Sequence, residues 1–179
     1  MTTDRIIVGE LQTNCYIIES KGKGVIVDPG AEPEEILRKS KETKIILILL
    51  THNHFDHIGG VIKLKAITSA ITAIHSLDWI DGFDKELNDG EKIKFEDEQI
   101  DVIHTPGHTP GSCCFLVKDN LFSGDTLFPG GLGNTSLPGG DENEIYRSIR
   151  DKLLILPDET KVYPGHGPST TIGNERYLY

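Results

Sequence analysis

The sequence predicts an α/β fold in one domain, and three observations lead to this. Strand-like and helix-like segments both occur along the chain. The continuous apolar run Ile45–Leu50 is too short to span a membrane and is typical of a buried central strand. A length of 179 residues suffices for one well-buried core and is short for two. We therefore expect a single domain over residues 1–179.

In the first half of the chain we expect strands bounded by turn residues, at positions 5–11, 14–20, 24–27, 45–50 and 71–74. Lys21-Gly22-Lys23 is typical of a hairpin between the second and third of them. Pro33 opens a helix that reaches about Lys41, with acidic residues in its first turn and basic residues near its end. Gly59-Gly60 ends the extended conformation that follows the central strand, and helices are expected at 61–66 and 76–80.

In the second half, a polar connection through Asp89-Gly90 precedes strands expected at 92–95, 99–104, 112–117, 121–123 and 161–163. Asp141 is placed to cap a helix from about Glu142 to Leu156, which Pro157 ends. Gly173 is expected to interrupt the last, weakly helical segment.

Composition and net charge argue against some classes of binding partner and against secretion. The net charge of −10 disfavours a surface that binds nucleic acid phosphates, so no nucleic acid partner is expected. No apolar run approaches the length of a membrane helix, and Met1–Arg5 lacks the segments of a signal peptide. Three cysteines, an odd number, argue against a disulfide framework. We expect a cytoplasmic protein without a membrane partner; the sequence leaves its oligomeric state open.

The histidines form the strongest chemical pattern. Residues 51–57 contain the motif H-x-H-x-D-H, formed by His52, His54, Asp56 and His57. Three further candidates follow in Gly-containing turns: His108 in T-P-G-H-T, Asp125 in S-G-D-T and His166 in P-G-H-G. Five imidazoles and two carboxylates are enough to hold two divalent metal ions with a shared carboxylate. The donor types favour zinc and also suit iron or manganese.

Each group of candidate ligands lies just past the end of an expected strand. His52 and His54 can point the same way where the chain stays extended, because side chains alternate along a strand. Gly or Pro precedes His108, Asp125 and His166 and lets the backbone come close. Strand-end loops at one sheet edge are where α/β folds place their chemistry. The sequence therefore predicts one shared metal site.

These residues, together with further segments, resemble the metallo-β-lactamase superfamily, and within it the short glyoxalase II-type hydrolases. The similar segments are 14–18 (N-C-Y-I-I), 27–30 (V-D-P-G), 105–112, 122–125, 137–141 and 163–168. The resemblance implies a four-layer αβ/βα sandwich of two mixed sheets flanked by helices. It also implies that His52, His54 and His108 hold a first metal, that Asp56, His57 and His166 hold a second, and that Asp125 bridges them.

The expected chemistry is thioester hydrolysis, as in conversion of S-lactoylglutathione to a hydroxy acid and a thiol. Water shared by two divalent ions is ionised near neutral pH, and Asp56 and Asp125 are the carboxylates closest to it. A leaving thiolate with a pKa of about 8.5 needs no strong general acid. The partner is then a small thioester.

Other activities stay open. The nearest rival is a persulfide dioxygenase with a single iron at His52, His108 and Asp125. A lactonase or other ester hydrolase of the superfamily is a further alternative, and a metal-binding protein without turnover is the least supported.

Two departures from the relatives bear on specificity. Only residues 167–179 follow His166, so we expect no helical C-terminal domain of the kind that grips glutathione in longer glyoxalase II proteins. Relatives often read G-R-T-D where this chain has Gly133-Asn134-Thr135-Ser136, so Asn134 and Ser136 replace an Arg and an Asp.

The remaining polar and aromatic residues are not expected to be ligands. Asp28 can either orient a ligand from behind or fix the turn with Pro29-Gly30. His75 and His104 lie outside the ligand set, and Trp79 and Tyr16 are expected to pack. Cys15, Cys113 and Cys114 lie in strand-like segments, where buried thiols are usual.

Overall fold

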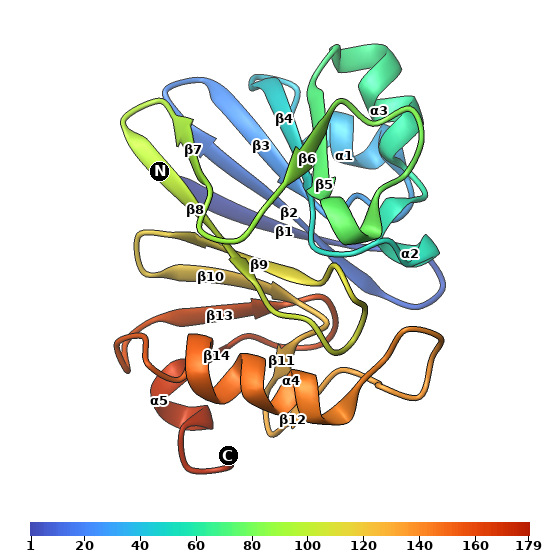
Figure 1. Cartoon of the computed structure of the whole chain (residues 1–179). Helices are drawn as coiled ribbons and strands as arrows, with labels where there is room; N and C mark the ends of the chain where they lie inside the picture. Colours follow the sequence, from blue (N-terminus) through green and yellow to red (C-terminus); the bar gives the residue numbers. More distant parts are fainter.

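A computed structural model describes residues 1–179, and it consists of two six-stranded sheets packed face to face (Figure 1). The first sheet has the order β1-β2-β3-β4-β5-β6 and the second the order β14-β13-β10-β9-β8-β7. The strands of the first sheet are β1 (Thr2–Val8), β2 (Thr13–Ser20), β3 (Lys23–Val27), β4 (Lys44–Leu50), β5 (Ile71–His75) and β6 (Lys85–Leu87). Those of the second are β7 (Lys92–Phe95), β8 (Glu98–His104), β9 (Cys113–Val117), β10 (Asn120–Gly124), β13 (Lys161–Pro164) and β14 (Thr170–Thr171).

Both sheets are mixed. In the first, β3 to β6 run parallel to one another, whereas β1 and β2 are antiparallel to their neighbours. In the second, only the β10–β13 pair is parallel. A separate two-stranded ribbon is formed by β11 (Leu127–Phe128) and β12 (Gly131–Leu132).

The helices cover the outer faces of the two sheets. α1 (Pro33–Lys39) and α3 (Val61–Thr68) lie on the first sheet, and α4 (Glu142–Ser148), the π-helical segment Ile149–Leu153 and α5 (Ile172–Glu175) lie on the second (Figure 1). Two one-turn helices, α2 (Phe55–Ile58) and the 3₁₀ turn Ser76–Asp78, lie in the loops that follow β4 and β5. No helix combines the length and the apolar character that crossing a membrane requires.

Three apolar clusters show why four layers form. The largest lies between the sheets and contains Tyr16, Leu49, Phe115 and Phe122. A second joins the outer face of the first sheet to Ile36 of α1 and to α3, and a third joins the second sheet to α4 and α5. Because residues alternate across a strand, Leu49 packs between the sheets while its neighbours Ile48 and Leu50 pack under the helices. The predicted αβ/βα sandwich is confirmed, and the apolar run of β4 is explained by burial on both faces.

Several element predictions need correction. The strand predicted at 5–11 is β1, which ends at Val8, because Gly9 and Gln12 have positive φ and close the turn to β2. Lys85–Leu87 was predicted as part of a polar connection but forms β6. Asp141 caps α4 by accepting from the amide of Glu144, as predicted, yet α-helical geometry stops at Ser148 and continues as a π-helical segment.

Gly173 does not interrupt the last helix but lies inside α5. A Cβ at this position would stand 3.0 Å from Cβ of Asp158, whose carbonyl accepts a hydrogen bond from the Gly173 amide. Close packing against the loop at Asp158 therefore accounts for a glycine within the helix.

Candidate metal centre

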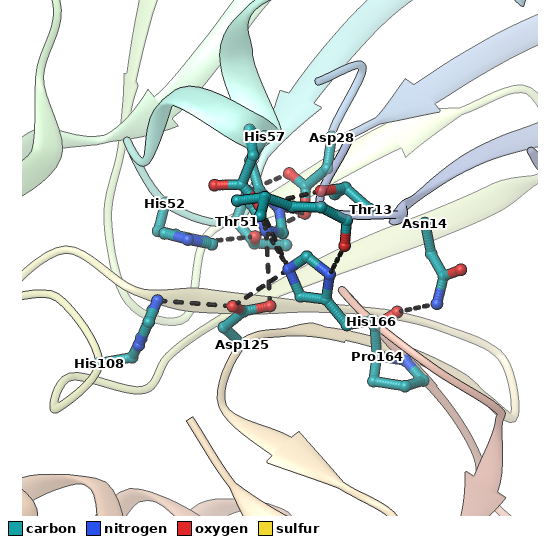
Figure 2. Close-up of polar contacts among 12 residues, drawn as sticks. Thr13, Asn14, Asp28, Thr51, His52, His57, His108, Asp125, Pro164 and His166 are labelled. Atoms are coloured by element: carbon teal, nitrogen blue, oxygen red, sulfur yellow. Dashed lines mark hydrogen bonds and ion pairs between the residues drawn. The ribbon is translucent and has the colours of Figure 1, made fainter. Parts of the chain in front are cut away.

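The five histidines and two aspartates predicted as ligands converge at one edge of the sandwich. They come from the loops that follow β4, β8, β10 and β13, so strands of both sheets contribute (Figure 2). Three overlapping groups of possible ligand atoms lie within 4.8 Å of one another: His52, His54 and His108; Asp56, His57 and His166; and His52, His57 and Asp125. The structure thus brings all seven residues together.

The first group is formed by histidines alone. The ring centroids of His52, His54 and His108 are 4.6–4.7 Å apart, with the planes almost perpendicular. His52 and His108 are buried, and the Nε2 atom of each is buried without a hydrogen-bond partner.

The second group contains a carboxylate. Oδ2 of Asp56 lies 3.2 Å from Nε2 of His166 and 3.4 Å from Nε2 of His57, and the two Nε2 atoms are 3.4 Å apart. Asp56 also accepts a hydrogen bond from Oγ1 of Thr13 at 2.9 Å.

Asp125 lies between the two groups. Its carboxylate oxygens are 3.5 Å from Nε2 of His57, 3.5 Å from Nε2 of His166 and 3.6 Å from Nε2 of His108. Figure 2 shows this carboxylate between His108 on one side and His57 and His166 on the other. Among the seven residues it has the position that a shared ligand requires.

The cluster fits divalent metal ions. Nε2 of His52, Nε2 of His108 and Oδ1 of Asp125 are buried polar atoms without a hydrogen-bond partner, which is costly unless something else satisfies them. All three belong to the predicted ligand set and lie among imidazole nitrogens and carboxylate oxygens. Such donors suit zinc, iron and manganese, and the donor set does not select one of them.

Hydrogen bonds at Nδ1 turn the Nε2 atoms of three histidines toward the cluster. His108 donates to the carbonyl of Asn134 at 2.8 Å, and His166 donates to the carbonyl of Leu11 at 3.1 Å. Nδ1 of His57 lies 2.9 Å from Oδ2 of Asp28. Such partners fix the tautomer and the ring orientation of metal-binding histidines.

Asp28 has both roles that the sequence left open. Its carboxylate accepts from the amide of Thr51 at 2.8 Å and from Oγ1 of Thr51 at 2.6 Å, in addition to its contact with His57. Because the Thr51 hydroxyl donates its proton to Asp28, its oxygen accepts from Nδ1 of His52 at 3.0 Å. The main-chain carbonyl of Asp28 accepts a hydrogen bond from the amide of Gly30, so Asp28 also fixes the turn.

The electrostatics reflect this arrangement. Burial lowers the pKa of His52, since the charged imidazolium is desolvated. Burial acts the same way on His57, but the neighbouring Asp28 outweighs it and raises the His57 pKa to about 9. Burial opposes ionisation of Asp56, yet hydrogen bonding to His166 and the charge of His57 hold its pKa below the ordinary value. Metal binding requires each of these imidazoles in its neutral form.

Asp78 is an important residue that the sequence reasoning missed. It is buried, and its Oδ2 accepts from Oγ1 of Thr109 at 2.6 Å and from the amide of Asn53 at 3.2 Å, while Oδ1 accepts from the amide of Gly111 at 2.8 Å. It therefore ties the loop that carries His52 and His54 to the loop that carries His108. Its isolated position after β5 offered no spacing signal.

Glycine is required where the cluster meets the backbone of the last ligand loop. A Cβ at Gly165 would stand 2.2 Å from Oδ1 of Asp125 and 2.6 Å from Cε1 of His57. The P-G-H turn thus supplies His166 and also leaves space for the shared carboxylate.

The residues set aside as non-ligands lie outside the three groups. His75 and His104 stack on each other with centroids 4.0 Å apart and planes 9° apart. Cys113 packs between the sheets and Cys114 under α4, as expected for adjacent strand residues, and both thiols are buried and free. Tyr16 packs in the core and donates to the carbonyl of Pro164 at 2.6 Å, and Trp79 packs against the cluster under the helices, so the packing expectation is confirmed.

Asn134 and Ser136 are the two residues at which the sequence departs from the pattern that the resemblance leads us to expect. The Asn134 carbonyl holds His108, and its side-chain oxygen accepts from the amide of Ser136 at 2.9 Å. The support of His108 at this segment is therefore a main-chain contact that does not depend on the replaced side chains.

Two surface cavities flank the cluster. One of about 400 Å³ borders Asp56 and is lined by Leu11, Phe55, Glu10 and Glu32 among others. The other, of about 260 Å³, borders His166 and is lined by Arg5, Ile7, Leu11 and Gln12 among others. Leu11 separates the two.

Comparison with known proteins places these features in context. The family model of the metallo-beta-lactamase superfamily matches residues 8–166, which include all seven ligand candidates. The chain is 35% identical to the protein named hydroxyacylglutathione hydrolase GloC of Haemophilus influenzae, over 98% of this chain and 95% of that one.

The comparison with solved structures agrees with the sequence comparison. The chain is similar to the BLEG-1 B3 metallo-beta-lactamase, with a TM-score of 0.92, 34% identity and 99% of each chain covered. It is similar to ETHE1 from Myxococcus xanthus, with a TM-score of 0.92, 30% identity and coverage of 98% of this chain and 82% of that one. The di-iron-bound form of TTHA1623 has a TM-score of 0.85, 35% identity and 96% of each chain covered.

Proposed function

The chain belongs to the metallo-β-lactamase superfamily, whose family model spans residues 8–166, and we propose from this premise that it is a binuclear metal-dependent thioester hydrolase of the glyoxalase II type. The substrate class is a hydroxyacyl thioester such as S-lactoylglutathione. The observation that carries the proposal is the arrangement of seven nitrogen and oxygen donors in two groups that share Asp125.

Divalent ions held there, with zinc the first expectation and iron or manganese the alternatives, would supply an ionised water near neutral pH and polarise the acyl carbonyl. The side chains of this protein contribute orientation. Asp28, Thr51 and the carbonyls of Asn134 and Leu11 hold the histidine rings in place. Preorganised ligands of this kind need little rearrangement when charge develops on the substrate.

Asp56 and Asp125 are the carboxylates closest to the reacting water in this proposal. The Thr13 hydroxyl donates to Asp56 and keeps its carboxylate turned toward His57 and His166. A carboxylate held in this way can accept a hydrogen bond from the water and so orient it toward the acyl carbon.

The leaving group distinguishes a thioester from an amide. A thiolate with a pKa of about 8.5 departs without a proton donor, whereas an amide nitrogen must be protonated. Neither cavity beside the cluster is lined by a Lys, Tyr or Cys side chain that could provide this proton. This supports a thioester over the β-lactam suggested by the name of BLEG-1.

A mononuclear iron persulfide dioxygenase is the second candidate. It would require His52, His108 and Asp125, and these residues lie close together: His52 shares a ligand group with Asp125, and Nε2 of His108 lies 3.6 Å from Oδ2 of Asp125. Asp56, His57 and His166 would then have no metal to bind, although they form an equally close group. The complete second group favours the hydrolase.

One experiment separates these activities. Protein purified without added metal is analysed for zinc, iron and manganese, and then assayed with S-lactoylglutathione, a γ-lactone, a β-lactam and glutathione persulfide. The proposal expects thioester hydrolysis in the absence of oxygen that is lost on chelation and restored by metal. Oxygen uptake on the persulfide with one iron per chain, and no thioester hydrolysis, would contradict it.

A further inference from the structure

One face of β1 is left partly uncovered at the edge of the first sheet. Arg5 stands opposite Tyr16 in the β1–β2 register, and Tyr16 packs between the two sheets. Arg5 and Ile7, two residues apart, therefore face the same side, toward the second sheet. Both are nevertheless exposed, Ile7 to 56%, and Arg5 contacts the loop after β13 through a hydrogen bond to Gly167.

The uncovered face forms a groove that starts at the metal cluster. Its inner part is the cavity of about 260 Å³ that borders His166 and is lined by Arg5, Ile7, Leu11 and Gln12. A second cavity of about 200 Å³ continues it and is lined by Thr3, Tyr163 and Ser169. Arg5 and Pro168 line both, so Arg5 lies in the middle of the groove.

The groove is the basic side of an otherwise acidic entrance. No Asp or Glu lines either part of it, and Arg5 forms no ion pair with a carboxylate. The cavity on the other side of Leu11 is lined by Glu10, Glu32 and Asp56. In a chain of net charge −10, an anionic group near the cluster is therefore attracted to the Arg5 side and repelled from the other.

We propose that this groove binds the carboxylate-bearing end of the thiol carrier, and that Arg5 is the residue that selects it. The inference rests on the proposed thioester hydrolase function. Nη1 of Arg5 donates to the carbonyl of Gly167 at 3.0 Å, which holds the side chain beside His166. The other guanidinium N–H groups remain for a carboxylate, which a planar guanidinium can bind through two parallel hydrogen bonds. Ile7 and Leu11 offer apolar contact to the intervening methylene groups.

The test compares a thioester that carries carboxylates with one that does not. The kcat/KM values of S-lactoylglutathione and of the lactoyl thioester of N-acetylcysteamine, a neutral thiol, are measured for wild type, Arg5→Gln and Arg5→Lys. Lys44→Gln is the matched control, because Lys44 is an exposed cation at the start of β4, forms no ion pair and lines neither part of the groove. Binding of S-methylglutathione, which cannot be hydrolysed, is measured by calorimetry on the same proteins.

We expect Arg5→Gln to lower the preference for the glutathione thioester about tenfold, mainly through KM, and to weaken S-methylglutathione binding by a similar factor. For Arg5→Lys, the preference for the glutathione thioester and the affinity for S-methylglutathione should lie between those of wild type and Arg5→Gln, since an ammonium keeps the charge but not the planar arrangement of donors. Lys44→Gln should match wild type. An equal loss with both thioesters would assign Arg5 a role in supporting the His166 loop instead, and unchanged preference and binding would overturn the proposal. If wild type hydrolyses neither thioester, the proposed function fails, while the binding measurement still decides the groove.

Discussion

Oδ2 of Asp28 lies 2.9 Å from Nδ1 of His57, and the same oxygen accepts from the hydroxyl of Thr51 at 2.6 Å. Through that hydroxyl it also acts on His52, so one buried carboxylate orients a histidine of each ligand group. Asp28 is not placed to bind a metal itself, because it contacts the side of the His57 ring that faces away from the cluster.

This relationship predicts different outcomes for two aspartate substitutions. Asp28→Asn keeps the shape and tolerates the positive φ of this position, but it loses the charge that holds His57, so we expect metal affinity to fall about 10- to 100-fold with the fold retained. Asp125→Ala removes the shared carboxylate and should release both ions and abolish activity. Metal retained at a series of buffered free zinc concentrations is the measurement. Equal metal loss in the two variants would show that Asp28 is itself a ligand.

The ligand groups also predict a stoichiometry. Two groups that share Asp125 should hold about two divalent ions per chain at full occupancy, since each group offers enough donors for one ion. Elemental analysis after reconstitution with zinc, and separately with manganese, measures this. His166→Ala removes a member of the second group only and should retain about one equivalent. A wild-type value that never exceeds one equivalent would favour the mononuclear alternative.

The ligand candidates could be found from sequence because each follows a strand end and sits in a short motif. H-x-H-x-D-H, T-P-G-H, S-G-D and P-G-H are local patterns, and parallel or mixed sheets bring such loops to one edge. The resemblance to the superfamily then supplied the layered arrangement, which periodicity alone did not.

The supporting contacts could not be found in this way. The carbonyls of Leu11 and Asn134 hold His166 and His108, but a main-chain carbonyl has no sequence signature, and Leu11 is 155 residues from its partner. Asp78 was missed because its hydrogen-bond partners lie in two loops that are distant from it in the sequence. The strand Lys85–Leu87 is short and mostly exposed, so it carries too little apolar pattern to distinguish it from a loop.

Asp78 gives a prediction about the first ligand group. In Asp78→Asn the amide nitrogen cannot accept from Gly111 or from Thr109 and Asn53, so at least one buried donor loses its acceptor. Loss of a hydrogen bond to a buried charged group costs about 1.5–3 kcal/mol. We expect a lower free energy of unfolding in the metal-free protein and weaker zinc binding, measured by denaturant titration and by competition with a chelator.

A milder variant separates loop positioning from general stability. Thr109→Val removes one donor to Asp78 and leaves the carboxylate and its bonds to Asn53 and Gly111 in place. It should weaken zinc binding less than Asp78→Asn does. If both variants lower stability and leave zinc affinity at the wild-type value, Asp78 supports the fold but does not position His52, His54 and His108.

Gly165 provides the sharpest steric test of the cluster. In Gly165→Ala the new methyl carbon would stand 2.2 Å from Oδ1 of Asp125 and 2.6 Å from Cε1 of His57, far inside van der Waals contact. The backbone of Gly165 does not have positive φ, so alanine is not strained there, and the effect falls on the side chains of the cluster. Gly131→Ala is the matched control, because Gly131 also lacks positive φ and a Cβ there would meet nothing within 4 Å.

We expect Gly165→Ala to fold, as followed by circular dichroism, but to bind less than one equivalent of zinc. Its rate of thioester hydrolysis should fall by at least about a hundredfold, which corresponds to a loss of roughly 2.7 kcal/mol in transition-state stabilisation. Gly131→Ala should keep both properties. Full metal content and wild-type rate in Gly165→Ala would mean that Asp125 and His57 do not need their present positions, and the shared-ligand arrangement would then be wrong.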